Sequence, residues 1–259
     1  MGRFETTVDF YRYREPYPPA FFATVAARLP LTRAARLLDI GCGPGVLAIG
    51  FAPFVGSCIG VDREPEMLRV ARAAATEARV DITFIQEGIE DLDCRHACFD
   101  FVTIGRALHW LPREATIGVL ERIVTPGGRI AVCGSTATAA PVNTWVTAFK
   151  AVRSAWASEP DESRYQVDID QWFAPSSFRK IDEIAVEHRQ LVTIDELIGR
   201  ALSFSITSPA VLGPLRPQFE TEMRAALEPF ARDGALEEEV VARAAVFGRA
   251  PEVRPISFD

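Results

Sequence analysis

One segment constrains the fold of this chain more than any other. An apolar run, Arg36–Ile40, leads directly into the glycine-rich sequence Gly41-Cys42-Gly43-Pro44-Gly45. The run predicts a short buried strand, and residues 45–54 predict a helix. Glycines let the backbone turn sharply and let a ligand approach it closely, and the first N–H groups of a helix have no partner inside it. Because open α/β sheets bind ligands at the carboxyl ends of their strands, this loop predicts a cofactor site.

Strand and helix alternate through the first half of the chain. Strands are predicted at residues 36–40, 57–61, 81–86, 99–104 and 129–133, and helices at 20–29, 45–54, 64–78 and 112–123. Most of these strands are continuous apolar runs, which is typical of strands that helices cover on both faces. The pattern predicts an α/β fold with a Rossmann-like, doubly wound, mostly parallel sheet and right-handed crossovers.

After Gly134 the alternation stops. A helix is predicted at 143–157, a polar loop at 158–165, and strands at 181–192 and 239–247, with one C-terminal strand expected to be antiparallel. Thr193 and Glu196 form a capping box that starts a helix to about Phe204. One stripe of a further helix consists of Phe219, Met223, Leu227 and Phe230. We therefore expect an N-terminal arm and helix at 1–30, forming part of a lid, and a main domain at 31–259. Helical cap insertions are expected at about 140–176 and 193–236.

Composition narrows the class of protein. The 259 residues carry a net charge of -7, so the chain lacks the basic character expected of a general nucleic-acid-binding protein, although the net charge leaves a local basic groove open. No apolar stretch is long enough to predict a membrane span, and no signal segment is evident at the N-terminus. The five cysteines have irregular spacings, which predicts free thiols in the cytoplasm. We expect no metal, because Cys94-Arg95-His96-Ala97-Cys98 has no second cluster of metal ligands to complete a site. We expect the protein to be a monomer or homodimer.

The spacing of the glycines argues against a phosphate-binding or nicotinamide-binding loop. A dinucleotide fingerprint needs Gly-x-Gly-x-x-Gly, and Val46 stands where the third glycine would be. The Gly-Lys-Ser/Thr sequence of a phosphate loop is also missing. Asp62 ends the second predicted strand, where a carboxylate can accept hydrogen bonds from both hydroxyls of a ribose. The same side chain would serve equally to cap the helix that begins near Glu64.

These residues together resemble the motifs of class I S-adenosylmethionine-dependent methyltransferases. Residues 37–45 resemble the first motif of the family, and Asp62 matches its ribose-binding acid. Gly88-Ile89-Glu90-Asp91-Leu92 is similar to the segment that contacts adenine. Phe99-Asp100-Phe101-Val102 with Ala107-Leu108-His109-Trp110 resembles the motif at the fourth strand, and Thr125-Pro126-Gly127-Gly128 resembles the turn before the fifth strand. The resemblance covers roughly residues 10–135. Residues 13–18 and 107–110 resemble a subgroup that contains trans-aconitate methyltransferases. Glu15 and Arg106 depart from that subgroup, which often has proline and glutamine there.

The resemblance implies S-adenosylmethionine as cofactor, S-adenosylhomocysteine as product, and in-line methyl transfer to a hydroxyl or carboxylate oxygen of a small molecule. The cofactor-binding residues that it implies are Asp39, Gly41, Cys42, Gly43, Gly45, Asp62, Arg63, Met67, Ile89, Glu90 and Arg106. Asp39 would support the loop as well. The substrate residues that we expect, partly as an N-terminal lid, are Tyr11, Tyr13, Arg14, Tyr17, Trp110 and Trp145.

His109 is the histidine that follows a predicted strand at the carboxyl edge of the sheet. Such a histidine can accept a proton from a hydroxyl nucleophile. The alternative is a ring that packs beside Trp110 and shapes the pocket, and transfer to a carboxylate would need no base. The sequence also leaves open a protein of the same fold that binds the cofactor without transferring methyl, either a sensor or a cyclase.

Overall fold

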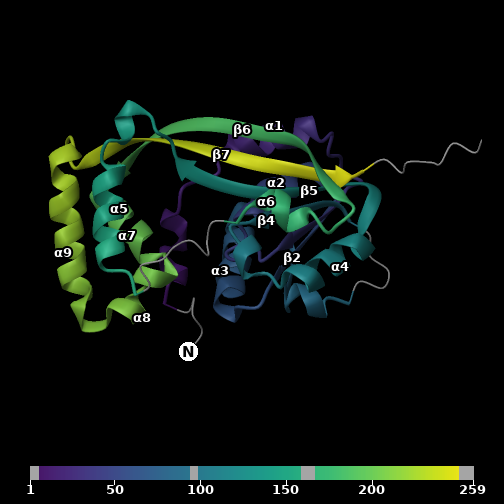
Figure 1. Ribbon diagram of the computed structural model, residues 1–259, viewed down its shortest axis with the longest axis horizontal. Helices are drawn as coiled ribbons and strands as arrows, with labels where there is room; N and C mark the ends of the chain where they lie inside the picture. The colour runs from purple at the N-terminus through teal and green to yellow at the C-terminus, as the bar shows by residue number, and fades with distance from the viewer. Residues whose placement is uncertain (1–5, 94–98, 159–166, 251–259) are drawn as a thin grey trace, which may run out of the picture.

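The computed structural model describes residues 6–93, 99–158 and 167–250 of the chain. Within them, one sheet contains seven strands in the order β3-β2-β1-β4-β5-β7-β6 (Figure 1). The strands are β1 (Arg36–Ile40), β2 (Ser57–Asp62), β3 (Thr83–Gln86), β4 (Phe99–Gly105), β5 (Val124–Ala137), β6 (Phe178–Thr193) and β7 (Ala235–Arg249). The first five are parallel, whereas β7 is antiparallel to β5 and to β6. The predicted Rossmann-like fold class is confirmed.

Helices cover both faces of the parallel part of the sheet. They are α1 (Pro19–Arg28), α2 (Val46–Phe51) and α3 (Pro65–Ala78), then α4 (Arg113–Ile123) and α6 (Ile169–Phe173). Neighbouring residues of a strand point to opposite faces. Accordingly, Leu37 packs in a core with α1 and α2, while Leu38 packs in a second core with α4 and α6. Both leucines are fully buried, which explains why the strand reads as a continuous apolar run.

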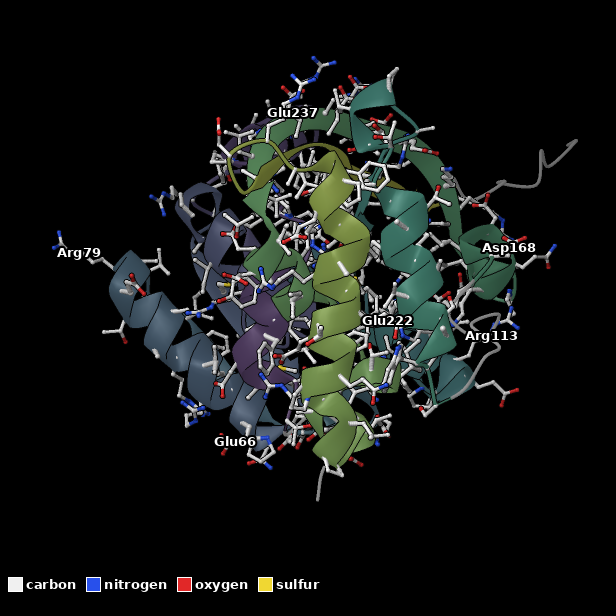
Figure 2. The ribbon with its side chains drawn as sticks, turned by 90° about the vertical axis from the view of Figure 1, so that its left-hand side faces the viewer. Glu66, Arg79, Arg113, Asp168, Glu222 and Glu237 are labelled. Atoms are coloured by element: carbon white, nitrogen blue, oxygen red, sulfur yellow. The ribbon has the colours of Figure 1, made fainter. Side chains whose placement is uncertain are left out.

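A third core lies beyond the end of the sheet. It is built from α5 (Val146–Ala155), α7 (Ile194–Leu202), α8 (Pro209–Leu212) and α9 (Arg216–Leu227), which we call the cap. Figure 1 shows the cap at the opposite end from α4, reached by the long arcs of β6 and β7. Figure 2 looks onto the cap, where α5 and α9 lie side by side. Because α6 packs on the sheet through Trp172 and Phe173, it does not belong to the cap.

Local sequence signals explain most element boundaries. Pro19 occupies the first position of α1, and the predicted capping box of Thr193 and Glu196 begins α7. The strand β5 is longer than predicted and takes in residues 125–128, where its register against β4 shifts. Phe230 is 38% exposed, so its inclusion in the apolar stripe was wrong; it follows the end of α9 in a 3-10 turn, η9 (Glu228–Phe230).

Some expectations concern residues that are not described. The segment Cys94–Cys98, and all but Ser158 of the loop predicted at 158–165, lie outside the described residues. In the part that is described, Cys42, Cys58 and Cys133 are buried free thiols, and none of the helices has the length and apolar character needed to cross a membrane. The expected division of the chain at residue 30 stays a prediction.

Candidate cofactor and substrate site

The loop between β1 and α2 has a backbone that favours glycine at three positions. Gly41, Gly43 and Gly45 have φ values of 62°, 51° and 81°, in the left-handed region. A Cβ atom at Gly41 would lie 2.7 Å from the Cβ of Ala107, whereas a Cβ at Gly43 would meet nothing within 4 Å. The Cys42 N–H donates to the Val61 carbonyl at 3.0 Å, which ties the loop to β2. The loop is therefore a tight bend between β1 and α2, held against the end of β2.

Asp39 holds this loop from behind. One carboxylate oxygen accepts a hydrogen bond from the Ala48 N–H at 3.2 Å, and the other accepts from the Thr103 hydroxyl at 2.8 Å. Burial raises the pKa of Asp39 to about 7. The structure thus gives Asp39 contacts with α2 and β4, which support the loop, and a contact of Asp39 with the cofactor stays a prediction.

Asp62, at the end of β2, shapes the other side of the loop. Its carboxylate accepts a hydrogen bond from the Gly43 N–H at 2.7 Å and from the Glu64 N–H at 2.9 Å. Burial raises the pKa of this carboxyl group, against the effect of these backbone hydrogen bonds. Each carboxylate oxygen can accept more than one hydrogen bond. Asp62 can therefore fix the start of α3 and still bind a ligand hydroxyl.

A cavity of about 150 Å³ lies against the loop, and we call it the loop cavity. Eight of the predicted cofactor residues line it: Gly41, Gly43, Asp62, Arg63, Met67, Ile89, Glu90 and Arg106. Three others, Asp39, Cys42 and Gly45, are not part of its lining and support the loop from behind or cap α2. Sequence reasoning missed Leu111 and Pro112, which also line it. They directly follow the predicted motif 107–110, so their position next to that motif could have identified them as residues of the site.

Glu90 contributes a buried acceptor to this cavity. It lies in η3 (Ile89–Asp91), and one of its oxygens forms an ion pair with the Arg63 guanidinium. The other, Oε2, is buried and has no hydrogen-bond partner among the described residues. A Cβ at Gly88 would lie 2.6 Å from that same oxygen and from the Arg63 Nε. A buried acceptor without a donor is costly, so this oxygen is suited to a ligand N–H or O–H group.

A second cavity, of about 450 Å³, lies between the carboxyl edge of the sheet and the cap, and we call it the cap cavity. It brings together six of the predicted residues: Tyr11, Arg14, Arg106, His109, Trp110 and Trp145. Tyr11, Arg106 and Trp110 line both cavities, so the two spaces adjoin.

Two predicted substrate residues do not line either cavity. The Tyr13 ring packs against Gly199 of α7, where a Cβ would lie 2.4 Å from the ring. Tyr17 is buried beside Phe21 and Phe22. Their part in the site is therefore to hold the N-terminal arm in place, and direct contact of either ring with a substrate stays a prediction.

Arg106 stands at the junction of the two cavities in a strained conformation. Its φ of 55° is left-handed, which is uncommon for a residue with a side chain. Its N–H donates to the Cys133 carbonyl at 3.3 Å, and its guanidinium donates to the Glu15 carbonyl. The guanidinium carbon also lies 4.9 Å from the centroid of the Tyr17 ring. These contacts with β5 and the N-terminal arm hold Arg106 where the cavities meet.

His109 lies in η4 (Leu108–Trp110), directly after β4. Its ring centroid is 4.8 Å from that of Trp110, as the packing alternative expects. Since His109 also lines the cap cavity, its ring is in position to meet an acceptor there. This position is compatible with both roles that the sequence suggests for His109, acceptance of a proton from the nucleophile and packing beside Trp110.

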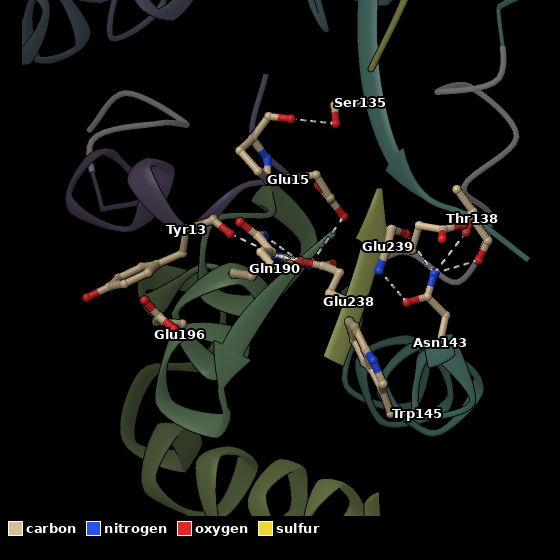
Figure 3. A network of polar contacts seen from close by, with 12 residues as sticks. Tyr13, Glu15, Ser135, Thr138, Asn143, Trp145, Gln190, Glu196, Glu238 and Glu239 are labelled. Carbon is tan, nitrogen blue, oxygen red and sulfur yellow. Dashed lines mark hydrogen bonds and ion pairs between the residues drawn. The ribbon is translucent and has the colours of Figure 1, made fainter. Parts of the chain in front are cut away.

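A buried ionic network fixes the N-terminal arm over the cap cavity (Figure 3). Arg200 of α7, 2% exposed, donates to both carboxylate oxygens of Glu238 on β7 and to the Tyr13 carbonyl at 2.8 Å. Its Nη1 lies 3.9 Å from Glu15.

Burial alone would raise the pKa of Glu15, but the guanidinium of Arg200 lowers it, as does that of Arg106. The Ser135 hydroxyl of β5 donates to the Pro16 carbonyl at 2.8 Å. Arm, cap and sheet therefore meet at one buried cluster.

The glycine-rich bend after β1, the carboxylate at the tip of β2 and the strand order with an antiparallel β7 together match the class I methyltransferase fold. Comparison with protein families agrees with this assignment. Residues 37–128 match the family model described as a methyltransferase domain. Residues 37–128 of the chain are therefore similar to a methyltransferase domain, and the sheet around them has the fold of class I methyltransferases.

Individual relatives extend the comparison. The ubiquinone biosynthesis O-methyltransferase of Xanthomonas oryzae pv. oryzae (strain PXO99A) is 35% identical over 108 residues, which are 41% of this chain and 45% of that protein. The chain thus spans less than half the length of this curated relative. A type II methyltransferase candidate from Anaeromyxobacter dehalogenans has a similar structure, with a TM-score of 0.64 and 21% identity over 91% of this chain and 97% of that one.

A third similar structure is a methyltransferase from Geobacter sulfurreducens in complex with S-adenosylhomocysteine. Its TM-score is 0.56 and its identity 16%, over 96% of this chain and 98% of that one. At such identities the solved structures establish a shared fold only. The acceptor of this chain must therefore be argued from its own cavities.

Proposed function

We propose that the protein is an S-adenosylmethionine-dependent methyltransferase that acts on a small molecule held in the cap cavity. One observation carries the proposal. The loop cavity, with Gly41, Gly43 and Asp62 in its lining, adjoins a larger cavity enclosed by the cap. A cofactor in the first space would present its reactive end to an acceptor in the second. The acceptor atom that we propose is a hydroxyl or carboxylate oxygen.

The residues of the loop cavity fit the proposed cofactor. Gly43 leaves open space beside the backbone for a close approach. Asp62 offers carboxylate lone pairs to the ribose hydroxyls, and the free oxygen of Glu90 offers an acceptor to a ligand N–H. Met67 and Ile89, both buried, give the cavity apolar walls. When bound, S-adenosylmethionine supplies a methyl group on a positively charged sulfur.

The chain itself supplies binding, orientation and exclusion of water. Tyr11, Arg106 and Trp110 lie where the two cavities meet, so their side chains determine how an acceptor approaches the methyl group. Alignment of the two reactants can contribute about 7–11 kcal/mol to the lowering of the barrier in favourable cases. With a hydroxyl acceptor, His109 would accept the proton that the oxygen loses as the new O–C bond forms.

Cofactor binding is tested by calorimetric titration of S-adenosylhomocysteine into wild type and Asp62→Asn. Hydrogen bonds to a charged group contribute about 1.5–3 kcal/mol each, so the variant is expected to bind more than about tenfold more weakly. Asp91→Asn is the matched control, because Asp91 is exposed and does not line the loop cavity. Equal affinity of Asp62→Asn and wild type, with both proteins folded, would contradict the ribose-binding role.

Methyl transfer is tested by incubating the protein with methyl-labelled cofactor and a panel of phenols, alcohols and carboxylic acids. For a hydroxyl acceptor, we expect His109→Gln to lower turnover about 100-fold or more while leaving affinity for S-adenosylhomocysteine unchanged. His188→Gln, on β6, is the control and should retain full turnover. If the cofactor binds but no acceptor gains label, the protein is a cofactor-binding module without transferase activity, the alternative left open by the sequence.

A further inference from the structure

The cap cavity has an excess of positive charge. Five cationic side chains line it: Arg14, Arg106, Lys150, Arg153 and Arg200. Among the described residues that line it, Glu15 is the acidic one, and Glu238 lies against Arg200 from behind. In the described part of the chain, five cations thus face two carboxylates, although the net charge of the whole chain is -7. A local charge opposite in sign to that of the whole protein is an electrostatic preference for an anion.

Two of these arginines converge on one aromatic ring. The guanidinium carbon of Arg14 lies 3.7 Å from the centroid of Phe204, and that of Arg153 lies 4.1 Å from it. Cation–ring contacts of this kind partly offset the cost of placing like charges together. Arg153 is 7% exposed and comes from α5 of the cap, whereas Arg14 comes from the N-terminal arm. The pair therefore bridges the two parts that enclose the cavity.

Arg14 retains donor capacity. One terminal nitrogen donates to the Ser203 carbonyl at 3.1 Å, while its Nε is buried and has no hydrogen-bond partner among the described residues. Burial lowers the pKa of Arg14; Tyr11 and the charge of Glu15 oppose this, and the charges of Arg106 and Arg153 lower the pKa further. A buried, unpaired donor amid mutually repelling cations would be stabilised by an anion that accepts from it.

One wall of the cavity is apolar. This wall, on the cap side, is formed by Trp145, Val146, Phe149 and Ile206. Trp145 and Phe149 are buried in the cap core with their rings 6.0 Å apart. A ligand that fits both features has an apolar body and a charged head, because the wall removes apolar surface from water and the arginines bind the charge.

We propose that Arg14 and Arg153, on either side of the arm–cap boundary, form a carboxylate-binding subsite, so that the acceptor is a small amphipathic organic acid. This inference rests on the proposed methyltransferase function and specifies its substrate class. Arg14, Arg153 and Phe204 line the cap cavity alone, whereas Arg106 and Trp110 also line the loop cavity. The bound carboxylate is therefore an anchor held away from the cofactor, and the atom that receives methyl is another group of the same molecule.

The test uses the full-length protein saturated with S-adenosylhomocysteine and measures binding of small probes by calorimetry. The probes are butanoate, benzoate and 3-phenylpropanoate, each beside its neutral amide, and inorganic phosphate. We expect a carboxylate to bind at least tenfold more tightly than its amide, benzoate or 3-phenylpropanoate to bind more tightly than butanoate, and phosphate to bind more weakly than either aromatic acid. Absence of a preference for carboxylate over amide across all three pairs would overturn the proposal, and so would phosphate binding as tightly as benzoate.

Substitutions test which residues cause the preference for a carboxylate over its amide. Arg153→Gln and Arg14→Gln should each abolish the preference for carboxylate over amide, while Arg153→Lys should keep part of it. Arg216→Gln is the matched control, since Arg216 also lies over an aromatic ring, that of Phe10 at 5.3 Å, but does not line the cavity. An unchanged preference in both glutamine variants would refute the subsite.

The experiments distinguish failure of the proposed methyltransferase function from failure of the carboxylate-binding subsite. If S-adenosylhomocysteine does not bind wild type, the proposed function is wrong. If it binds with equal affinity to wild type and every arginine variant, and no carboxylate is preferred, only the subsite is wrong. Urea unfolding of Arg153→Gln establishes that the variant is folded, and Arg153→Lys provides a second folded test because it keeps the charge and loses the planar fork of donors.

Discussion

Substitution of Gly41 by alanine is the sharpest test of the bend that forms the loop cavity. Two costs follow from the structure. At a φ of 62°, a residue with a side chain is destabilised by about 1–2 kcal/mol. The new Cβ would also lie 2.7 Å from the Ala107 Cβ, and overpacking of this kind costs about 1–3 kcal/mol. Gly41→Ala should therefore lower the free energy of unfolding by about 2–5 kcal/mol.

Gly43→Ala is the control for the first of these costs. Gly43 has a φ of 51°, but a Cβ there would meet nothing within 4 Å, so only the backbone cost of about 1–2 kcal/mol remains. Replacing Ala107 by glycine in the Gly41→Ala background should remove most of the additional cost. Urea unfolding of wild type, Gly41→Ala, Ala107→Gly and the double mutant forms a double-mutant cycle that measures the steric cost, and Gly43→Ala is unfolded beside them. Equal destabilisation by Gly41→Ala and Gly43→Ala would refute the steric reasoning, as would a double mutant with no recovery.

Two further predictions concern buried carboxylates. The pKa of Asp39 in the folded protein is raised to about 7, so the folded state binds an additional proton between about pH 4 and 7, and stability falls as pH rises through that window. Urea unfolding should show Asp39→Asn gaining about 3 kcal/mol relative to wild type between pH 4.5 and 7.5; a constant difference would contradict the raised pKa. Glu238→Gln removes one partner of a buried ion pair with Arg200 and should destabilise the protein by about 3–5 kcal/mol. Glu66→Gln, in an exposed pair with Arg69, should leave the free energy of unfolding nearly unchanged, and similar losses in the two variants would argue against the network.

The parallel half of the fold could be predicted because its information is local. Buried strands such as β1 are continuous apolar runs, and the helices between them begin at recognisable residues, such as Pro19 in α1. The glycine bend and Asp62 are adjacent to strand ends, and parallel strands bring their carboxyl ends to one edge. The positions of these residues along the chain were therefore enough to predict most of the cofactor residues that line the loop cavity.

The cap could not be predicted in the same way, because its contacts join distant segments. Arg200 and Glu238 are 38 residues apart and meet only when α7 packs on β7. Arg153 reads in the sequence as an ordinary surface residue of a helix, yet it is buried and lies against Phe204, 51 residues further along the chain. A buried arginine of this kind carries no local pattern, so the cationic side chains that α5 and α7 contribute to the cap cavity were visible only in the structure, whereas Arg14 and Arg106 were predicted from the sequence.

The bend after β1 and the carboxylate of Asp62 are proposed to bind the nucleoside part of S-adenosylmethionine. A crystal structure of the protein with S-adenosylhomocysteine tests this proposal most directly. The ribose hydroxyls are expected within hydrogen-bond distance of Asp62, with the sulfur facing the junction at Arg106 and Trp110. A nucleoside bound elsewhere on the protein, with the loop cavity unchanged, would contradict the account.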